Sequence, residues 1–286
     1  MPEPALRLIV LARDQGQQVQ DAWEELSGFL NAQPNTEVVA AAVNEDLKLD
    51  DLDADLVVVL GGDGAMLRAC RQLGMRQLPI LGINLGRLGF LADLTVKEFR
   101  TLFPRLHARD YRVIDHLMFE CIHHRADGGS QLHLGLNDVV VSTASSLAMI
   151  NVKLTIDGED VTTYSCDGLI VSTPVGSTAH SLSAGGPILQ QDLQAFVITP
   201  ICPHTLTNRP LVDRANCVYT LTVPDAPEGV MVVIDGQVKE PMAPDDAIEV
   251  RKAPVSLRLV RFSGHSNYTT LHRKLGWGGQ PRYRTQ

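Results

Sequence analysis

The first third of the chain alternates between apolar runs typical of strands and apolar stripes typical of helices. Residues 6–12 form an almost continuous apolar run, as in a strand that is buried on both faces. Between residues 16 and 33, apolar side chains recur at helical spacing and form one stripe. Further strands are expected at residues 37–43, 56–60 and 79–85, and further helices at residues 64–73 and 96–111. This βαβ alternation predicts an α/β domain with a Rossmann-like parallel sheet.

From about Arg112 onward, the pattern changes to short strands separated by turns. Strands are expected at residues 151–156 and 159–164, and Asp157-Gly158 between them is typical of a hairpin turn. Further β runs are expected at residues 218–223, 230–234, 248–251 and 255–262, and a helix at residues 268–275. We therefore expect residues 1–112 to form the α/β domain and residues 113–265 a β-rich, β-sandwich-like domain. The C-terminal helix, within residues 266–286, is expected to pack back on the first domain.

The composition is that of an acidic globular protein. Of its 286 residues, 44% are hydrophobic and 20% are charged, which are ordinary values for a folded domain. The chain carries 25 Lys plus Arg against 33 Asp plus Glu, and because the basic residues form no block, we expect no nucleic-acid partner. Net negative charge also disfavours long-range attraction of phosphates. A nucleotide site here has to rely on local backbone donors and a divalent cation.

The cysteines and the N-terminal segment indicate a cytoplasmic protein. The five cysteines are scattered and include no C-x-x-C pair, which is typical of reduced thiols. The first apolar run is interrupted by Arg13 and Asp14, so it predicts a first strand and not a signal peptide. The sequence contains no stretch of about 20 apolar residues, and we therefore expect no membrane partner.

A glycine-rich turn with one aspartate follows the strand expected at residues 56–60. Its residues are Gly61, Gly62, Asp63 and Gly64, and a helix is expected directly after them. Glycines let a phosphate approach the backbone closely, and the N-terminus of a helix favours an anion. An aspartate in such a turn suits the handling of a proton, a hydroxyl or a metal. The alternative is a capping aspartate in an ordinary Asp-Gly turn.

A second polar motif, Asn137-Asp138, precedes an apolar run that predicts an interior strand. An asparagine presents both a donor and an acceptor to a purine edge, and an aspartate accepts from ribose hydroxyls. The alternative is a polar pair at the entrance of an ordinary strand.

The third motif is a long uncharged stretch that follows Asp167. From Gly168 to Gln191 no Asp, Glu, Lys or Arg occurs, and the stretch is rich in glycine, serine and threonine. A strand that opens into such a loop, followed by a short helix, suits sugar hydroxyls, an amide and a base edge better than a bare triphosphate. The alternative is a Ser/Thr-rich surface loop.

These three motifs, in this order, resemble the NAD kinase family. Residues 81–91, 199–206, 234–237 and 274–277 fit the same family, so the resemblance extends from about Leu56 to the C-terminus. Gly-Gly-Asp-Gly by itself also resembles lipid kinases and phosphofructokinases. The block from Asp167 to Pro187 is more discriminating.

The resemblance implies a two-domain kinase that transfers the γ-phosphate of ATP, or a phosphate of polyphosphate, to the adenosine ribose 2′-hydroxyl of NAD and yields NADP. Asp63 would take the proton of that hydroxyl. Mg²⁺ or another divalent cation would be held mainly by the substrate phosphates. The resemblance also implies a homodimer or homotetramer whose subunits meet through the β-rich domain, which would bind the dinucleotide.

The resemblance also carries a set of site residues. Those implied for NAD are Asp63, Gly64, Asn137, Asp138, Asp167, Thr178, Ala179, His180 and Ser183. Those implied for phosphate are Gly61, Gly62 and Gly64, with Arg87 as a further candidate in a glycine-flanked loop. The alternative for Arg87 is a solvated surface arginine.

The chain departs from the family pattern at three positions. Ala65 stands where the family usually has Thr, Val175 where it has Thr or Ser, and His180 where it has Tyr. Ala65 and Val175 leave open a non-catalytic dinucleotide sensor of the same fold. The shared Gly-Gly-Asp-Gly element leaves open a lipid kinase.

Overall fold

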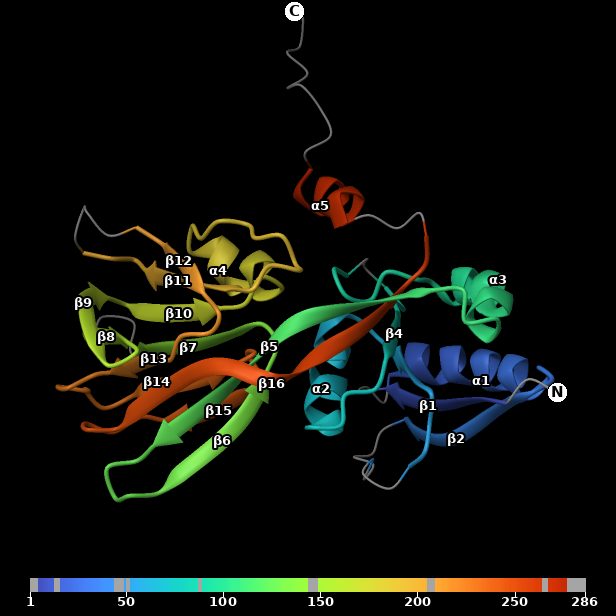
Figure 1. Ribbon diagram of the computed structural model, residues 1–286, viewed down its shortest axis with the longest axis horizontal. Helices are drawn as coiled ribbons and strands as arrows, with labels where there is room; N and C mark the ends of the chain where they lie inside the picture. The colour runs from blue at the N-terminus through green and yellow to red at the C-terminus, as the bar shows by residue number, and fades with distance from the viewer. Residues whose placement is uncertain are drawn as a thin grey trace, which may run out of the picture. The chain divides into compact units, whose positions relative to one another are not determined.

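The computed structural model describes residues 5–12, 16–43, 49, 52–86, 89–143, 149–204, 209–263 and 267–276. The chain divides into two compact units, of which the first is Met1–Ile114 together with Arg258–Gln286 and the second is Asp115–Leu257. The two passages of the chain between the units lie in the strands β5 (Arg112–His124) and β16 (Ala247–Arg261), which Figure 1 labels.

The first unit is built on a parallel sheet in the order β2-β1-β3-β4-β16. Parallel pairing joins β1 to β2, β1 to β3 and β3 to β4, and Leu259 of β16 pairs in parallel with Ile80. All residues of β3 are buried, as expected for a strand covered on both faces. The Rossmann-like sheet predicted from the sequence is confirmed. Its other strands are β1 (Leu6–Ala12), β2 (Thr36–Val43), β3 (Leu56–Leu60) and β4 (Ile80–Ile83).

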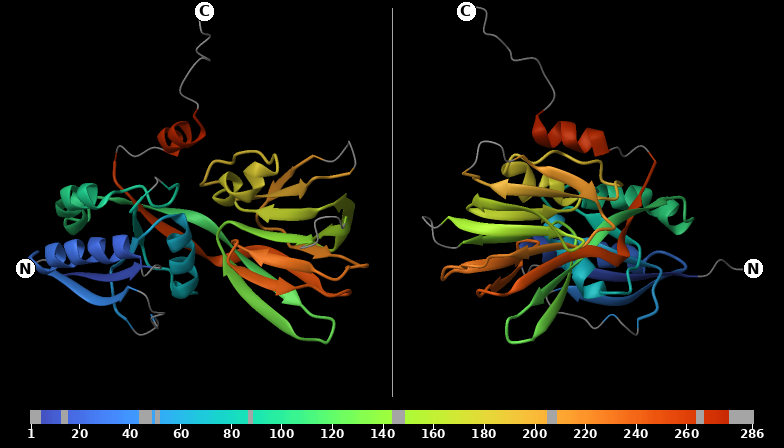
Figure 2. Two further views of the ribbon diagram at one scale, coloured as in Figure 1. Left: turned by 180° about the vertical axis from the view of Figure 1, so that it is seen from behind. Right: turned by 60° about the vertical axis from the view of Figure 1, so that its left-hand side comes forward.

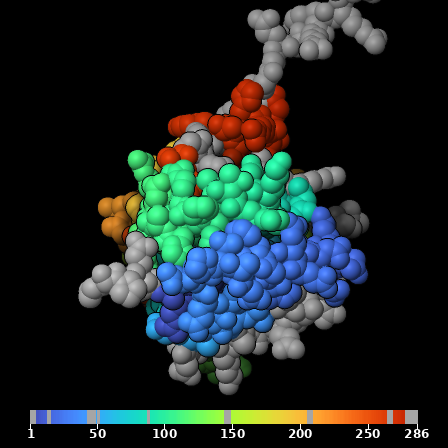
Figure 3. Space-filling model, turned by 90° about the vertical axis from the view of Figure 1, so that its right-hand side faces the viewer, coloured from blue at the N-terminus to red at the C-terminus, as the bar shows by residue number. Residues whose placement is uncertain are grey.

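Two helices, α1 (Gln17–Asn31) and α3 (Val96–His107), lie side by side in this unit (Figure 3). The rings of Phe29 and Phe103 pack edge to face at 5.3 Å, and those of Phe99 and Phe103 at 5.7 Å. These rings join the apolar stripe of α1 to the buried side chains of the sheet in one core. The remaining helices of the unit are α2 (Asp63–Leu73) and α5 (Asn267–Leu275).

The second unit contains a six-stranded sheet, β12-β11-β10-β7-β14-β15, and the strands β16-β13-β8-β9 with the β5–β6 pair. Figure 2 shows these strands from two further sides. The bounds are β6 (Ser130–Gly135), β7 (Asp138–Thr143), β8 (Ile150–Ile156), β9 (Glu159–Cys166), β10 (Gly168–Ser172), β11 (Ala195–Ile201), β12 (Leu211–Arg214), β13 (Tyr219–Thr222), β14 (Val230–Ile234) and β15 (Val238–Pro241).

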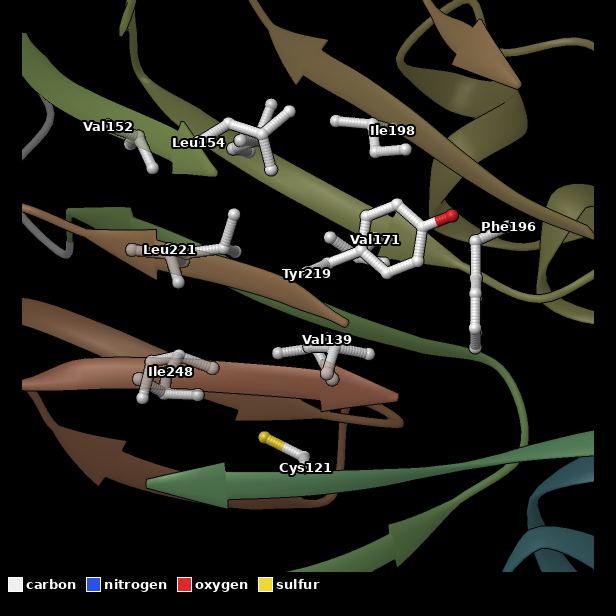
Figure 4. Packing of buried hydrophobic residues seen from close by; sticks show 14 of the residues in the cluster. Cys121, Val139, Val152, Leu154, Val171, Phe196, Ile198, Tyr219, Leu221 and Ile248 are labelled. Atoms are coloured by element: carbon white, nitrogen blue, oxygen red, sulfur yellow. The ribbon is translucent and has the colours of Figure 1, made fainter. Parts of the chain in front are cut away.

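Side chains from both sets of strands form one hydrophobic core in this unit (Figure 4). Val139 and Val171 come from the six-stranded sheet, and Leu154 and Leu221 come from the other strands. Tyr219 is buried among them, and its hydroxyl donates to the Arg214 carbonyl at 2.6 Å. The arrangement is a β-sandwich, as the alternation of the sequence predicted.

The strand predictions for the second unit are partly right. Asp157 and Gly158 have φ values of 51° and 83°, as a tight hairpin turn between β8 and β9 requires, so this turn is confirmed. The separate strands expected at residues 248–251 and 255–262 are wrong, because β16 is one continuous strand. Pro254 lies within it but is exposed, and the buried Ala253 and Leu257 keep the alternation of a sheet strand.

Candidate active site

The glycine-rich turn joins β3 to α2 and places Asp63 at the carboxyl end of an interior strand. Gly62 is the residue before the first turn of α2, which begins at Asp63. Gly61 has a φ of 135°, and a Cβ added there would lie 2.9 Å from the Ala65 Cβ. The Gly61 amide donates to the Ile83 carbonyl of β4 at 2.9 Å. Because that donor is used within the sheet, any role of Gly61 toward phosphate has to come from its missing side chain.

The Asp63 carboxylate is held by three consecutive backbone amides of the loop before α3. Its Oδ2 accepts from the Phe90 amide at 2.9 Å, and its Oδ1 accepts from Leu91 at 2.9 Å and Ala92 at 3.3 Å. The loop approaches so closely that a Cβ added to Gly89 would lie 2.1 Å from Oδ1. A carboxylate offers about four acceptor positions. In the described part of the chain these bonds use three, and the side chain remains 32% exposed.

A lysine that the sequence left without a role lies beside this carboxylate. The Nζ of Lys274, on α5, is 3.7 Å from Asp63 Oδ2 and 4.2 Å from the centre of the Phe90 ring. The site thus contains a positive charge next to the carboxylate. The only sequence signal was that Lys274 belongs to a tail segment that resembles the NAD kinase family.

The second unit contains a pocket of about 220 Å³ that brings several predicted residues together. Among the predicted site residues, Asn137, Asp138, Ala179 and His180 line it. Its other walls come from β7 and from the segment around β14, namely Val140, Ser142, Val233, Asp235 and Gly236. The structure therefore brings the Asn137-Asp138 pair together with two residues of the uncharged loop.

Three other predicted residues of this unit are not among the described residues that line the pocket. The Thr178 hydroxyl donates to the Val175 carbonyl at 3.0 Å, within the short 3₁₀ turn η1 (Gly176–Thr178). Ser183 is exposed at the end of α4 (His180–Ser183). Asp167 is half exposed, and its Oδ1 lies 3.8 Å from the Nε2 of His204. Their binding roles stay predictions.

An aspartate that was not among the predicted site residues, although residues 234–237 resemble the family, organises one wall of the pocket. Asp235 has a φ of 50°, and its carboxylate is buried. Its Oδ1 accepts from the amides of Asn137 at 2.7 Å and Asp138 at 3.2 Å, and its Oδ2 accepts from Leu136 at 3.0 Å. Three consecutive amides thus surround one carboxylate, and the Asn137-Asp138 backbone is fixed by it.

Asp138 is the residue of this pocket with the most altered acidity. Burial raises the pKa of Asp138 from an ordinary 3.8 to about 7, the charge of Asp235 adds to the rise, and a hydrogen bond from the His180 backbone opposes it. Near neutral pH the side chain is therefore present in both forms. The protonated form donates a hydrogen bond and the ionised form accepts one, so a single residue can meet either kind of polar group.

Four further observations concern predicted residues and ligands. Arg87 lies outside the described residues. Within the ranges that the structure describes, no cluster of three or more His, Cys, Asp or Glu side chains is arranged to hold a metal ion. Of the helices described, none is both long and apolar enough to cross a membrane. Ala65 and Val175, where the family usually has a hydroxyl, are both buried.

Sequence comparisons cover nearly the whole chain. A family model described as the ATP-NAD kinase N-terminal domain matches residues 11–111, and one described as the ATP-NAD kinase C-terminal domain matches residues 136–262. An NAD kinase from Rhodopirellula baltica is 43% identical over 274 residues, which is 96% of this chain and 88% of the relative. An NAD kinase from Geotalea daltonii is 42% identical over 233 residues, or 81% of this chain and 82% of the relative.

Solved structures of the same architecture carry ligands. Yeast NADH kinase, complexed with NADH, superposes with a TM-score of 0.89 at 25% identity and covers 99% of this chain and 91% of its own. An NAD kinase from Archaeoglobus fulgidus, in complex with ATP, superposes with a TM-score of 0.74 at 28% identity, over 96% of this chain and 100% of its own.

Proposed function

Because the chain belongs to the NAD kinase family, we propose that Asp63 takes the proton from the ribose 2′-hydroxyl while the γ-phosphate of ATP is transferred to NAD. The activity is that of an ATP-dependent NAD kinase, a phosphotransferase with an alcohol acceptor. The observation that supports Asp63 most is its carboxylate, which three amides hold in one orientation while part of its acceptor capacity remains.

The proposed step forms one bond and breaks one. The 2′-oxygen attacks the γ-phosphorus, the bond from that phosphorus to the β–γ bridging oxygen breaks, and ADP leaves with the electron pair. The hydroxyl proton passes to the Asp63 carboxylate, which requires a separation of about 2.6–3.2 Å. Phosphoryl transfer leaves little covalent work for a protein, so orientation and charge neutralisation account for most of the rate. The Lys274 ammonium, 3.7 Å from Asp63, supplies positive charge at this place.

NAD recognition is assigned to the pocket of the second unit. Asn137, Asp138, Ala179 and His180 line it, and Asp138 can donate or accept near neutral pH. Such a mixed polar lining suits a base edge and sugar hydroxyls. Thr178, Ser183 and Asp167 are proposed as additional contacts of the dinucleotide. Gly62 and Gly64, at the N-terminus of α2, are proposed to face phosphate.

A divalent cation, Mg²⁺ in the first instance, is proposed as the cofactor, held mainly by the phosphates of the nucleotide. This fits the donor set, because the described residues include no cluster of three metal-binding side chains, and Mg²⁺ commonly keeps substrate phosphates and waters as ligands. The cation offsets phosphate charge when bound. Chelation with EDTA is expected to abolish NADP formation without unfolding the protein, and excess Mg²⁺ is expected to restore it.

The carboxylate at position 63 is tested by Asp63→Asn in an assay of NADP formation from NAD, ATP and Mg²⁺. Turnover is expected to fall by roughly 10²–10⁴, because general-base help is lost. Asparagine keeps Oδ1 for the Leu91 and Ala92 amides but turns an NH₂ toward the Phe90 amide, so thermal unfolding is measured in parallel. Asp225→Asn, at an exposed turn, is the matched control. Near-normal turnover of Asp63→Asn would remove the proposed base.

The same assay distinguishes an NAD kinase from the two alternatives that the sequence had left open. A dinucleotide sensor would bind NAD in calorimetry but form no NADP, and a lipid kinase would phosphorylate a lipid alcohol in preference to NAD. Replacing ATP by polyphosphate, or NAD by NADH, measures the donor and acceptor range directly.

A cytoplasmic homodimer or homotetramer is proposed for the assembly. The cysteines are free, and four of the five are buried, which is consistent with a reducing compartment. Exposed apolar residues lie on strands of the second unit, Leu132 on β6, Val161 on β9 and Val212 on β12. Light scattering with Val161→Lys, which places a charge on β9, tests whether these strands form the subunit contact.

A further inference from the structure

A buried arginine forms hydrogen bonds to the loop that holds the Asp63 carboxylate. Arg261, the last residue of β16, is only 9% exposed. Its Nη2 donates to the Phe90 carbonyl at 2.9 Å, and its Nη1 donates to the Leu91 carbonyl at 3.1 Å and to Asp93 Oδ1 at 2.7 Å. The guanidinium thus donates hydrogen bonds to two successive carbonyls of the loop and to one carboxylate.

The two carbonyls belong to the same peptide groups whose amides bind Asp63. The Phe90 carbonyl and the Leu91 amide form one peptide group, and that amide donates to Asp63 Oδ1 at 2.9 Å. The Leu91 carbonyl and the Ala92 amide form the next, and that amide donates to the same oxygen at 3.3 Å. Each peptide group therefore has a cation at its oxygen and a carboxylate at its N–H. Hydrogen bonds in such a chain polarise and strengthen one another.

An ion pair with Asp93 alone does not explain this geometry. The ion pair uses only Nη1 of the guanidinium. Nη1 also donates to the Leu91 carbonyl, and Nη2 donates to the Phe90 carbonyl. A buried ion pair need not stabilise the fold, because the cost of desolvating two charges can cancel their attraction. Burial lowers the pKa of Arg261, and the charges of Asp93 and Asp63 oppose the lowering, so Asp63 lies within the electrostatic reach of this cation.

We propose that Arg261 is a positioning residue for the reaction: through the Phe90–Leu91 and Leu91–Ala92 peptide groups it fixes the orientation of the Asp63 carboxylate. The inference rests on the proposed role of Asp63 as the base. Arg261 touches the loop and not the reacting atoms, so its removal affects catalysis only through Asp63.

The test is a double-mutant cycle of Arg261→Lys and Asp63→Asn, with kcat and both KM values measured for NADP formation. Lysine keeps the charge but cannot reach both carbonyls, so kcat is expected to fall about tenfold or more, since an error of about 1 Å at a catalytic group costs up to about 10²-fold. The KM values for NAD and ATP are expected to stay within about twofold, because substrate binding is untouched. Arg258→Lys, the same change at an exposed position of β16, is expected to leave kcat unchanged.

On the Asp63→Asn background, Arg261→Lys is expected to lower kcat by less than about twofold, since residues that act as one unit are not additive. Full additivity, or a normal kcat for Arg261→Lys alone, overturns the inference. Normal turnover of Asp63→Asn overturns instead the proposed base, and the two failures are thereby distinguished. If Arg261→Lys does not fold, Arg261→Gln combined with Asp93→Asn removes both buried charges together, and the same loss of kcat is expected.

Discussion

Asp138 and Asp235 exchange backbone and side-chain hydrogen bonds: the Asp235 carboxylate accepts the Asp138 amide at 3.2 Å, and the Asp138 carbonyl accepts the Asp235 amide at 2.9 Å. Both side chains are buried. The Asp235 carboxylate accepts from the amides of residues 136–138, which stabilise its negative charge, whereas the Asp138 carboxylate accepts from the backbone of His180. Burial and the neighbouring charge of Asp235 disfavour the ionised form of Asp138, whose pKa rises to about 7.

Asp138→Asn is expected to change how stability depends on pH. The folded protein holds the Asp138 proton up to about pH 7, whereas the unfolded chain releases it near 3.8. Between these values the folded state binds more protons, so its stability falls as pH rises and levels off above about pH 7. From pH 5 to pH 8 the wild type should therefore lose about 1–3 kcal/mol more unfolding free energy than Asp138→Asn. Urea denaturation of both proteins checks this, and parallel pH profiles would contradict it.

Asp235→Asn is expected to weaken NAD binding more than turnover. The new NH₂ group faces a backbone N–H, and because two donors cannot form a hydrogen bond, the backbone of Asn137 and Asp138 is expected to move. We expect the KM for NAD to rise about tenfold or more, with a loss of about 1–3 kcal/mol in stability. Asp245→Asn is the matched control, because Asp245 is exposed and also has a positive φ, of 65°. Equal KM values for the two variants would show that Asp235 does not shape the pocket.

Gly89→Ala is expected to damage catalysis from outside the reacting groups. The added Cβ would lie 2.1 Å from Asp63 Oδ1, so the carboxylate or the loop has to move. A displacement of this size is expected to reduce kcat by about 10²-fold. Gly86→Ala in the same loop is the control, since a Cβ there meets no atom within 4 Å. Steady-state kinetics compare the kcat values of the two variants at one temperature. Similar kcat values would argue against a tight fit around Asp63.

His123→Leu is expected to destabilise the second unit. The two ring nitrogens of the buried His123 lie 2.8 Å from Glu240 Oε2 and 2.9 Å from Asp246 Oδ2, so one imidazole ring bridges two carboxylates. Its loss removes a hydrogen-bond partner from each of the two buried carboxylates, and we expect about 3–5 kcal/mol less stability. His124→Leu removes only an exposed contact to Glu249 at 3.4 Å and should cost less than about 1 kcal/mol. Guanidinium denaturation compares them, and equal losses would contradict a special role of His123.

The same cluster predicts acid sensitivity. Burial alone would raise the pKa values of Glu240 and Asp246, but hydrogen bonds outweigh it, including those of His123, and both pKa values are lowered in the folded state. Stability from these groups is present above their ordinary values of 4.5 and 3.8 and is lost as pH falls below them. Wild-type protein should therefore lose more stability between pH 6 and pH 3.5 than His123→Leu does.

Local patterns predicted much of the fold. The strands at residues 6–12, 56–60 and 230–234 have the predicted bounds, because a strand inside a sheet is buried on both faces or alternates strictly. The helix of the tail was placed within one residue, since its apolar spacing and Gly276 mark it locally. By contrast, β5, β6, β11, β12 and β15 were not predicted, and β16 was split in two. Exposed positions weaken the period of two on β5, β6, β12 and β15. The strand β11 is buried along almost its whole length and therefore shows no alternation.

The sequence by itself determined the first strands of the parallel sheet, the glycine-rich turn and the presence of Asp63 in that turn, because each depends on residues next to one another in the chain. Tertiary structure alone decided which polar atoms meet. Arg261 reaches Leu91 across 170 residues, and Asp235 reaches Asn137 across 98. Such pairs leave no periodic signal, since their geometry arises only when distant strands are brought together. The shifted acidity of Asp138 has the same origin, because burial and the neighbouring charge both exist only in the folded chain.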